Sequence, residues 1–144
     1  MLSILIPTYN YVCVKLVTDL QQQAERLECP YEILVADDAS EDAFKRENRK
    51  INGIPNCKYI ELQENVGRSR IRNILGCLAR YDYLIFMDCD ASVVSNEFLS
   101  RYIRNSFRHR RFLWRFSTKN TPSLTSRQKN GLYTPTKSSA RLIS

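Results

Sequence analysis

The stretch from Asp82 to Asp90 constrains the fold of this 144-residue chain more than any other. Five apolar residues, Tyr83 to Met87, run without interruption and lead directly into two carboxylates, Asp88 and Asp90. A short and continuous apolar run is typical of a strand that is buried on both faces of a parallel sheet. Open α/β sheets bind their ligands at the carboxyl ends of their strands. The run therefore places two acidic side chains where a ligand is expected.

Asp88 and Asp90 are two residues apart, so in extended backbone their side chains point the same way, with Cα atoms about 6–7 Å apart. Two carboxylates at that separation repel each other by about 2–3 kcal/mol at an effective dielectric constant of about 20. A hard divalent cation that prefers oxygen ligands, Mn²⁺ or Mg²⁺, would offset this repulsion. The pair therefore predicts a metal site at the end of the strand.

Strand-like and helix-like segments alternate along most of the chain. Short apolar runs predict strands at residues 2–6, 32–36, 58–62 and 83–87. Apolar residues at helical spacing predict helices at residues 14–28, 68–79 and from 95 or 96 onward. A polar helix is predicted at about residues 41–50, with Ser40 as its cap and acidic residues in its first turn. This alternation is typical of an α/β fold with an open, mostly parallel, Rossmann-like sheet flanked by helices.

The composition changes near residue 107, which divides the chain into a folded domain, residues 1–107, and a tail, residues 108–144. From residue 98 onward there are 11 Lys or Arg and no Asp or Glu, whereas the first 97 residues hold 11 basic and 15 acidic residues. The tail is basic and rich in Ser and Thr, and beyond a short strand within residues 112–116 it is predicted to be partly disordered, or a truncated or frame-shifted terminus. Because the net charge of +7 belongs to the tail, nucleic-acid binding is not expected of the folded part.

The cysteines and the hydropathy pattern indicate the compartment. Five cysteines are scattered without a Cys-x-x-Cys pair, and an odd number argues against a disulfide framework. No apolar segment approaches the about 18 residues that a membrane span requires, and the N-terminus lacks the features of a signal peptide. We therefore expect reduced thiols in a cytoplasmic protein.

Other uses of an Asp-x-Asp pair fit less well. An EF-hand loop that begins at Asp88 requires Gly at its sixth position and Glu at its twelfth, where this chain has Val93 and Leu99. The segment also looks like the nucleophile motif of haloacid-dehalogenase-type phosphatases. Those enzymes hold Mg²⁺ with further downstream carboxylates, and the last acidic residue here is Glu97.

Four segments together resemble the N-terminal half of glycosyltransferase family 2 enzymes, which have the GT-A fold. They are SILIPTYN at residues 3–10, EILVADDAS at 32–40, NVGRSRIRN at 65–73 and FMDCD at 86–90. Their order and spacing are more specific than any one motif, and the resemblance spans residues 2 to about 105. Ala39 stands where the family commonly has Gly.

The resemblance implies a role for residues at the ends of the first two strands. Pro7, Thr8 and Tyr9 would line a nucleotide pocket. Asp37 would accept a hydrogen bond from the imide N–H of a uridine-type base.

The later segments supply the rest of the implied site. Arg72 and Asn73 would hold the nucleotide or the loop around it. Asp88 would face the ribose or the donor sugar, and Asp90, together with Asp88, would ligate Mn²⁺ or Mg²⁺. The run of Arg68, Arg70 and Arg72 could serve phosphate oxygens, although such a run is also typical of a solvated helix face.

The reaction implied by the resemblance is metal-dependent, inverting transfer of a sugar from a nucleotide-diphosphate donor, expected to be a UDP-sugar, to a glycan or lipid-linked acceptor. The general base normally comes from the second half of the family's domain and is not identified here, so transfer is expected to be impaired. Association with the inner face of a membrane and self-association through exposed apolar surface are also expected.

Two alternatives stay open. One is a non-catalytic nucleotide-sugar-binding or interaction module with a basic tail. The other is a nucleic-acid binder that acts through the tail, with steeply salt-dependent affinity.

Overall fold

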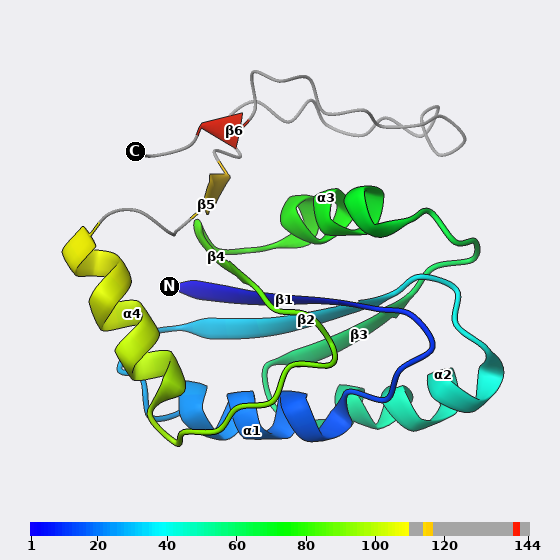
Figure 1. Ribbon diagram of the computed structural model, residues 1–144, viewed down its shortest axis with the longest axis horizontal. Helices are drawn as coiled ribbons and strands as arrows, with labels where there is room; N and C mark the ends of the chain where they lie inside the picture. Colours follow the sequence, from blue (N-terminus) through cyan, green and yellow to red (C-terminus); the bar gives the residue numbers. More distant parts are fainter. Residues whose placement is uncertain (110–113, 117–139, 142–144) are drawn as a thin grey trace.

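The computed structural model describes residues 1–109, 114–116 and 140–141, with side chains up to residue 104. The disorder or altered reading frame predicted for the tail concerns residues that lie almost wholly outside this part. The described elements form one sheet with helices on both of its faces (Figure 1).

The sheet has the strand order β3-β2-β1-β4-β5-β6. The first four strands in this order are mutually parallel, and β5 and β6 add to the β4 edge in antiparallel fashion. The predicted α/β fold with an open, mostly parallel sheet is therefore confirmed, and β5 lies within the strand expected at residues 112–116. The strands are β1 Leu2–Thr8, β2 Tyr31–Asp37, β3 Cys57–Glu61, β4 Tyr83–Phe86, β5 Trp114–Phe116 and β6 Ala140–Arg141.

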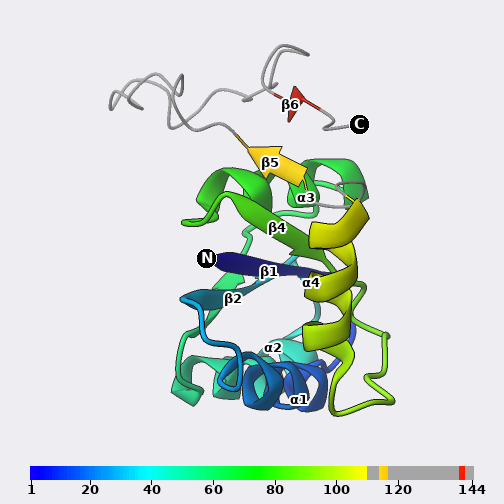
Figure 2. The same cartoon turned by 90° about the vertical axis from the view of Figure 1, so that its left-hand side faces the viewer.

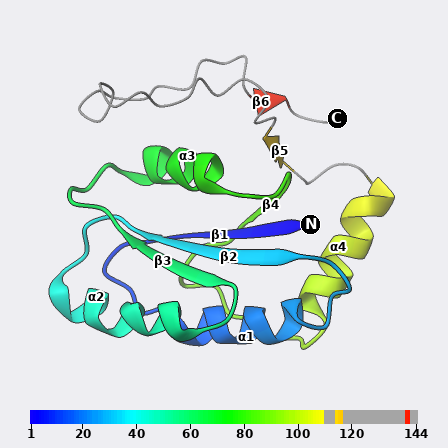
Figure 3. The ribbon, with the colours of Figure 1, turned by 180° about the vertical axis from the view of Figure 1, so that it is seen from behind.

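Helices cover the two faces unequally. Figures 1 and 3 show α1 and α2 beneath the sheet and α3 above it. Seen from the end, in Figure 2, α4 runs along the side of the molecule, where it contacts α1. The helices are α1 Val14–Ala24, α2 Asp42–Asn48, the short 3₁₀ helix η1 Arg49–Gly53, α3 Arg68–Leu78 and α4 Phe98–His109.

The two faces of β1 contribute to different parts of the core. Ile4 and Ile6 are fully buried in the cluster beneath the sheet, together with Leu20 of α1. Leu5 points to the other face, where it packs in a cluster with Ile71 of α3. Successive side chains of a strand alternate between faces, so a strand buried on both must be apolar throughout. Each such side chain stabilises the fold by about 1.5–3 kcal/mol through its burial.

The connections of the sheet create a break in its pattern between β1 and β4. The helix after β1 lies on one face, whereas α3, which leads into β4, lies on the other. The connection that leaves β1 and the connection that enters β4 therefore run on opposite faces of the sheet. This arrangement is called a topological switch point, and α/β sheets bind ligands there. Thr8 of β1 is in register with Asp37 of β2, and the Met87 amide donates to the Leu5 carbonyl at 3.0 Å. The strand ends predicted to converge therefore do so.

The cap predicted for the second helix is wrong. α2 begins at Asp42 with Glu41 at its N-cap position, and no side chain caps it. The Ser40 hydroxyl instead accepts a 2.8 Å hydrogen bond from the backbone N–H of Asn10. Ser40 therefore joins the loop after β1 to the turn after β2, a long-range contact that local sequence does not reveal.

Candidate functional site

A cleft of about 540 Å³ opens at the carboxyl edge of the sheet, beside the switch point. Part of its wall is formed by Pro7, Thr8 and Tyr9 from the end of β1, and by Tyr11 from the loop that follows. Tyr9 is 54% exposed and Tyr11 is 43% exposed. Both rings are thus accessible for stacking on a planar ligand. The three residues predicted at the end of the first strand all border the cleft.

Asp88 and Asp90 border the same cleft, together with Cys89 between them. Both carboxylates are exposed. Asp88 is held by two guanidinium groups, because Nη2 of Arg68 and Nη1 of Arg72 lie 3.3 and 3.4 Å from its Oδ1 atom. Ion pairs this exposed contribute little net free energy. The two arginines are therefore free to exchange Asp88 for another anion.

The two arginines are positioned by α3. Arg68 is the first residue of this helix and lines the cleft. Arg72 lies one turn further on, with its guanidinium carbon 4.8 Å from the centre of the Phe86 ring, a cation–π contact that orients the side chain. Asn73, predicted to help hold a nucleotide, is exposed and is not part of the cleft wall.

Asp38 is the carboxylate of the second strand end that reaches the cleft. Its two oxygens accept hydrogen bonds from the backbone N–H groups of Val66, at 2.7 Å, and Gly67, at 3.0 Å. Gly67 has a φ of 83°, in the left-handed region that glycine adopts without steric cost. Asp38 thus fixes the loop before α3, which in turn sets the position of Arg68.

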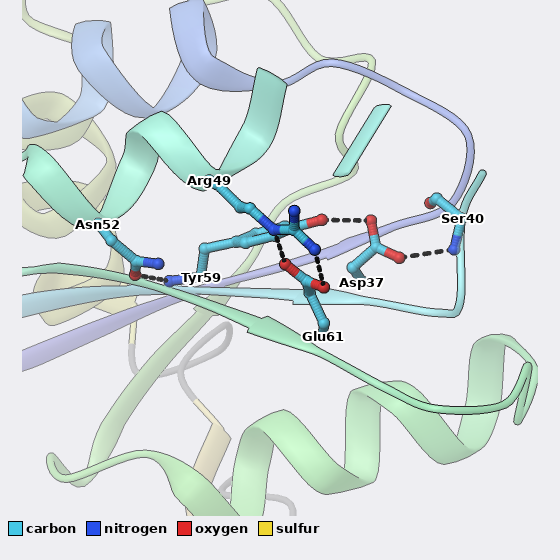
Figure 4. Close-up of polar contacts among 6 residues, drawn as sticks. All are labelled: Asp37, Ser40, Arg49, Asn52, Tyr59 and Glu61. Atoms are coloured by element: carbon cyan, nitrogen blue, oxygen red, sulfur yellow. Dashed lines mark hydrogen bonds and ion pairs between the residues drawn. The ribbon is translucent and has the colours of Figure 1, made fainter. Parts of the chain in front are cut away.

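Asp37, by contrast, does not border the cleft. Its side chain is 0% exposed, with one oxygen accepting from the Ser40 N–H at 2.7 Å and the other from the Tyr59 hydroxyl at 2.6 Å (Figure 4). Because Asp37 is fully buried and lies outside the cleft wall, it is not placed to make the predicted contact with a nucleotide base in this cleft. Asp38, one residue later, does border the cleft, although it is only 5% exposed.

Two buried groups beneath the cleft have shifted pKa values. Burial raises the pKa of the Cys13 thiol to about 12. Burial, followed by the hydrogen bond to Asp37, raises the pKa of Tyr59 well above its usual range. Both groups therefore stay protonated at neutral pH, and the Tyr59 hydroxyl is a permanent donor to Asp37.

The cleft is also bordered by residues that were not predicted as site residues from the sequence. Tyr11, Asn65, Gly67 and Cys89 border it. Asn65 and Gly67 lie in the segment NVGRSRIRN at residues 65–73, where a glycine directly before a predicted helix indicates a turn that could border a site. Nothing in the local sequence indicates Tyr11, whose carbonyl accepts a 3.1 Å hydrogen bond from the Thr8 hydroxyl at the strand end.

The donor set at Asp88 and Asp90 suits a hard divalent cation, because both side chains offer carboxylate oxygens. Within residues 1–109, 114–116 and 140–141, no three His, Cys, Asp or Glu side chains form a cluster that could hold a metal alone. A cation at the two aspartates would need further oxygens, and a diphosphate could supply them. Asp88 and Asp90 would therefore hold Mn²⁺ or Mg²⁺ only together with further oxygen ligands. They do not lie in the extended backbone predicted for them, because β4 ends at Phe86 and the Ala91 N–H donates to the Asp88 carbonyl at 3.1 Å, which makes a turn.

The protein is thus an α/β domain with a cleft at a switch point, where Asp88 and Asp90 line the cleft and two arginines pair with Asp88. The sequence model of glycosyl transferase family 2 matches residues 3–135. The chain belongs to this family. The matched region extends past residue 105, where the motif resemblance ends.

Two curated relatives match the chain over part of their length. It is 33% identical over 91 residues to a chondroitin synthase of Escherichia coli and 28% identical over 90 residues to a hyaluronan synthase of Pasteurella multocida. Each match covers 62% of this chain, but only 13% and 9% of the respective relative. The chain thus spans a small fraction of the proteins it resembles.

Solved structures extend the likeness to the fold. The crystal structure of S. aureus TarS 1-349 in complex with UDP has 26% sequence identity and a TM-score of 0.60, over 76% of this chain and 32% of that one. The mannosyltransferase PcManGT from Pyrobaculum calidifontis, in complex with GDP-Man and Mn²⁺, has a TM-score of 0.58 at 21% identity and covers 72% of this chain and 31% of that one. The second likeness shows the fold alone. In the described part of this chain, no helix is both long and apolar enough to cross a membrane.

Proposed function

We propose that the cleft binds the nucleotide-diphosphate part of a sugar donor, of the UDP-sugar class, for inverting transfer to an acceptor hydroxyl. The observation that carries this proposal is the rim where Arg68 and Arg72 surround Asp88 beside Asp90. A rim with both charges suits a ligand whose phosphates need cationic partners and whose charge is shared with a metal.

Each group has a part in holding the donor. The exposed ring of Tyr9 stacks on the base, and Asp38 accepts the imide N–H that distinguishes uracil from cytosine. Arg68 and Arg72, which pair with Asp88 in the absence of a ligand, donate to phosphate oxygens in place of Asp88. Asp90 and Asp88 hold Mn²⁺ or Mg²⁺, which as a Lewis acid supplies charge stabilisation to the departing diphosphate.

Support for this assignment comes from the relatives and from the geometry together. TarS, the structure with the higher TM-score of the two, is recorded in complexes with UDP and with UDP-GlcNAc. Asp38 and Tyr9 border one cleft here, so one ligand could contact both. The chain covers only 32% of the TarS structure in complex with UDP, so neither an acceptor site nor a general base is assigned to it.

Titration calorimetry with UDP, in the presence and absence of Mn²⁺, tests the proposal. Wild-type chain should bind UDP more tightly with Mn²⁺, and Asp90→Ala should lose most of that Mn²⁺-dependent gain. Asp82→Ala is the matched control, because Asp82 is an exposed carboxylate that precedes the same strand and lies outside the cleft wall. The proposal would be contradicted if Mn²⁺ did not change the affinity of the wild type for UDP, or if Asp90→Ala kept the full Mn²⁺-dependent gain in affinity.

A non-catalytic nucleotide-sugar-binding module is the second candidate, and one observation favours it. No Asp or Glu follows Glu97 in this sequence, so the segment after α4 begins has no carboxylate to act as a general base. The two candidates differ in turnover. Release of free sugar or of a glycosylated acceptor from a UDP-sugar would indicate the enzyme, whereas binding of UDP without any release would indicate the module.

A further inference from the structure

The hydroxyl of Tyr59 lies beneath the cleft without bordering it. Tyr59 sits on β3 and is 6% exposed. Its hydroxyl donates a 2.6 Å hydrogen bond to Oδ2 of Asp37 (Figure 4). Figure 4 also shows the ion pair between Arg49 and Glu61 next to the ring, at 2.7 Å.

One chain of hydrogen bonds leads from this hydroxyl to the first wall of the cleft. The other oxygen of Asp37 accepts from the Ser40 N–H at 2.7 Å. The Ser40 hydroxyl in turn accepts from the N–H of Asn10 at 2.8 Å. Asn10 directly follows Tyr9, whose ring borders the cleft. A contact on β3 is therefore linked through three residues to the backbone that carries Tyr9.

A second chain ends on the same loop. The side chain of Asn48 is fully buried and lies close enough to the Tyr59 hydroxyl to lower its pKa slightly against the effect of burial. Its amide nitrogen donates to the carbonyl of Tyr11 at 2.8 Å, and its oxygen accepts from the Cys13 N–H at 3.0 Å. The loop after β1 is thus fastened at both of its ends to groups that meet at Tyr59.

Both turns that these chains hold are in a costly conformation. Asn10 has a φ of 47° and Ala39 a φ of 60°, and the left-handed region costs an L-residue about 1–2 kcal/mol. Such conformations persist where surrounding contacts enforce them, and they cluster at ligand sites. Here the enforcing contacts converge on one hydroxyl, and the two turns flank Asp38.

We propose that Tyr59 is a positioning residue that sets the selectivity of the cleft for a base with an imide N–H. Tyr59 touches no ligand. It fixes Asp37 and Asn48, and these hold the Asp38 turn and the Tyr9 loop at the spacing that one pyrimidine base requires. This inference rests on the proposed function, because it assumes that the cleft binds a uridine nucleotide.

The test compares the affinities of UDP and CDP, each measured by calorimetry with Mn²⁺. Tyr59→Phe removes only the hydroxyl, and the net loss of about 1 kcal/mol for one hydrogen bond corresponds to about a fivefold change. We expect UDP affinity to fall by about that factor and the UDP-to-CDP affinity ratio to shrink with it. A variant that merely destabilises the fold would weaken both nucleotides equally and leave the ratio unchanged.

Tyr31→Phe is the matched control. Tyr31 is 9% exposed and belongs to the same core cluster, but it begins β2 at the opposite edge of the sheet. This variant should leave the ratio at its wild-type value. Ser40→Ala, which cuts the first chain while keeping Tyr59, should shrink the ratio in the same direction and serves if Tyr59→Phe does not fold.

The outcomes separate this inference from the function on which it rests. A wild-type chain that does not bind UDP would overturn the proposed function and this inference with it. A wild type that binds UDP, with a ratio that is unchanged in Tyr59→Phe and in Ser40→Ala, would overturn the inference alone.

Discussion

Asp37 and Asp38 are consecutive in the chain, yet only the carboxylate of Asp38 borders the cleft, while that of Asp37 is fully buried beneath it. The reason is the alternation of side chains along a strand. β2 continues through Asp37, which therefore points to the same face of the sheet as Val35, where Tyr59 of the neighbouring strand also lies. Asp38 takes the opposite direction as the chain leaves the sheet.

The burial of Asp37 predicts a stability effect for Asp37→Asn. An amide keeps the shape but cannot accept from both the Ser40 N–H and the Tyr59 hydroxyl, so a buried donor loses its partner. We expect the free energy of unfolding, measured by urea denaturation, to fall by about 1–3 kcal/mol. Asp82→Asn, at an exposed carboxylate, should change it by less than about 0.5 kcal/mol. Equal effects of the two substitutions would contradict the burial argument.

The elements of this fold were accessible to sequence reasoning because β1, β2 and β4 each contain a run of mostly apolar residues. The strand ends converge on one edge for a topological reason, which the alternation of strands and helices already contains. The choice between Asp37 and Asp38 was not accessible, because it depends on whether β2 ends before or after Asp37. A one-residue difference in a strand end exchanges the carboxylate that borders the cleft for the one that does not.

The partners of Ser40 and Asn48 were hidden for a different reason. Ser40 precedes a helix and has a side chain typical of a cap, but its hydroxyl is taken by Asn10, 30 residues away in the chain. Asn48 holds Cys13, 35 residues away. Contacts of this kind follow from the packing of α2 beneath the sheet, and no local pattern indicates them.

The φ of 60° at Ala39 predicts that Ala39→Gly stabilises the protein. Glycine adopts the left-handed region without the steric cost that Cβ imposes, and this gain exceeds the added entropy of the unfolded chain. We expect the free energy of unfolding to rise by about 0.5–1 kcal/mol. The control has the opposite sign: Ala43→Gly, at an exposed position within α2, should lower it by about 0.5–1 kcal/mol. A destabilising effect at position 39 would contradict the strain inferred from its backbone.

The raised pKa of Cys13 predicts a loss of stability in alkaline solution. Burial raises the pKa of the folded thiol to about 12, whereas a thiol in the unfolded chain has its ordinary pKa of 9.0. Its contribution is therefore fully present below pH 9 and is lost as the pH rises toward 12, because only the unfolded state releases the proton. The slope from this thiol is at most about 1.4 kcal/mol per pH unit.

Urea denaturation at several values from about pH 8 to about pH 10.5 measures that slope. Cys13→Ala should flatten it, although burial also raises the pKa values of Cys57 and Tyr59, so part of the slope will remain. The comparison uses the slope and not the absolute stability, since loss of a buried side chain lowers the latter at every pH. Identical slopes in the wild type and in Cys13→Ala would refute this assignment.

The sharing of Asp88 by Arg68 and a divalent cation predicts effects of opposite sign for Arg68→Gln. Without nucleotide, the guanidinium lies 3.3 Å from the Asp88 carboxylate and competes with a cation for it. Removing this charge should raise the affinity for Mn²⁺ alone, by about twofold to fivefold for an exposed pair worth about 0.5–1 kcal/mol. With Mn²⁺ present, the same substitution should lower the affinity for UDP, because a phosphate partner is lost.

Arg70→Gln is the control, since Arg70 lies on the same helix outside the cleft wall. Electron paramagnetic resonance reports free Mn²⁺ and calorimetry reports UDP binding, so the two signs are measured independently. A substitution that weakens both ligands would show that Arg68 acts on the fold of the rim and not as a charge exchanged between Asp88 and the diphosphate.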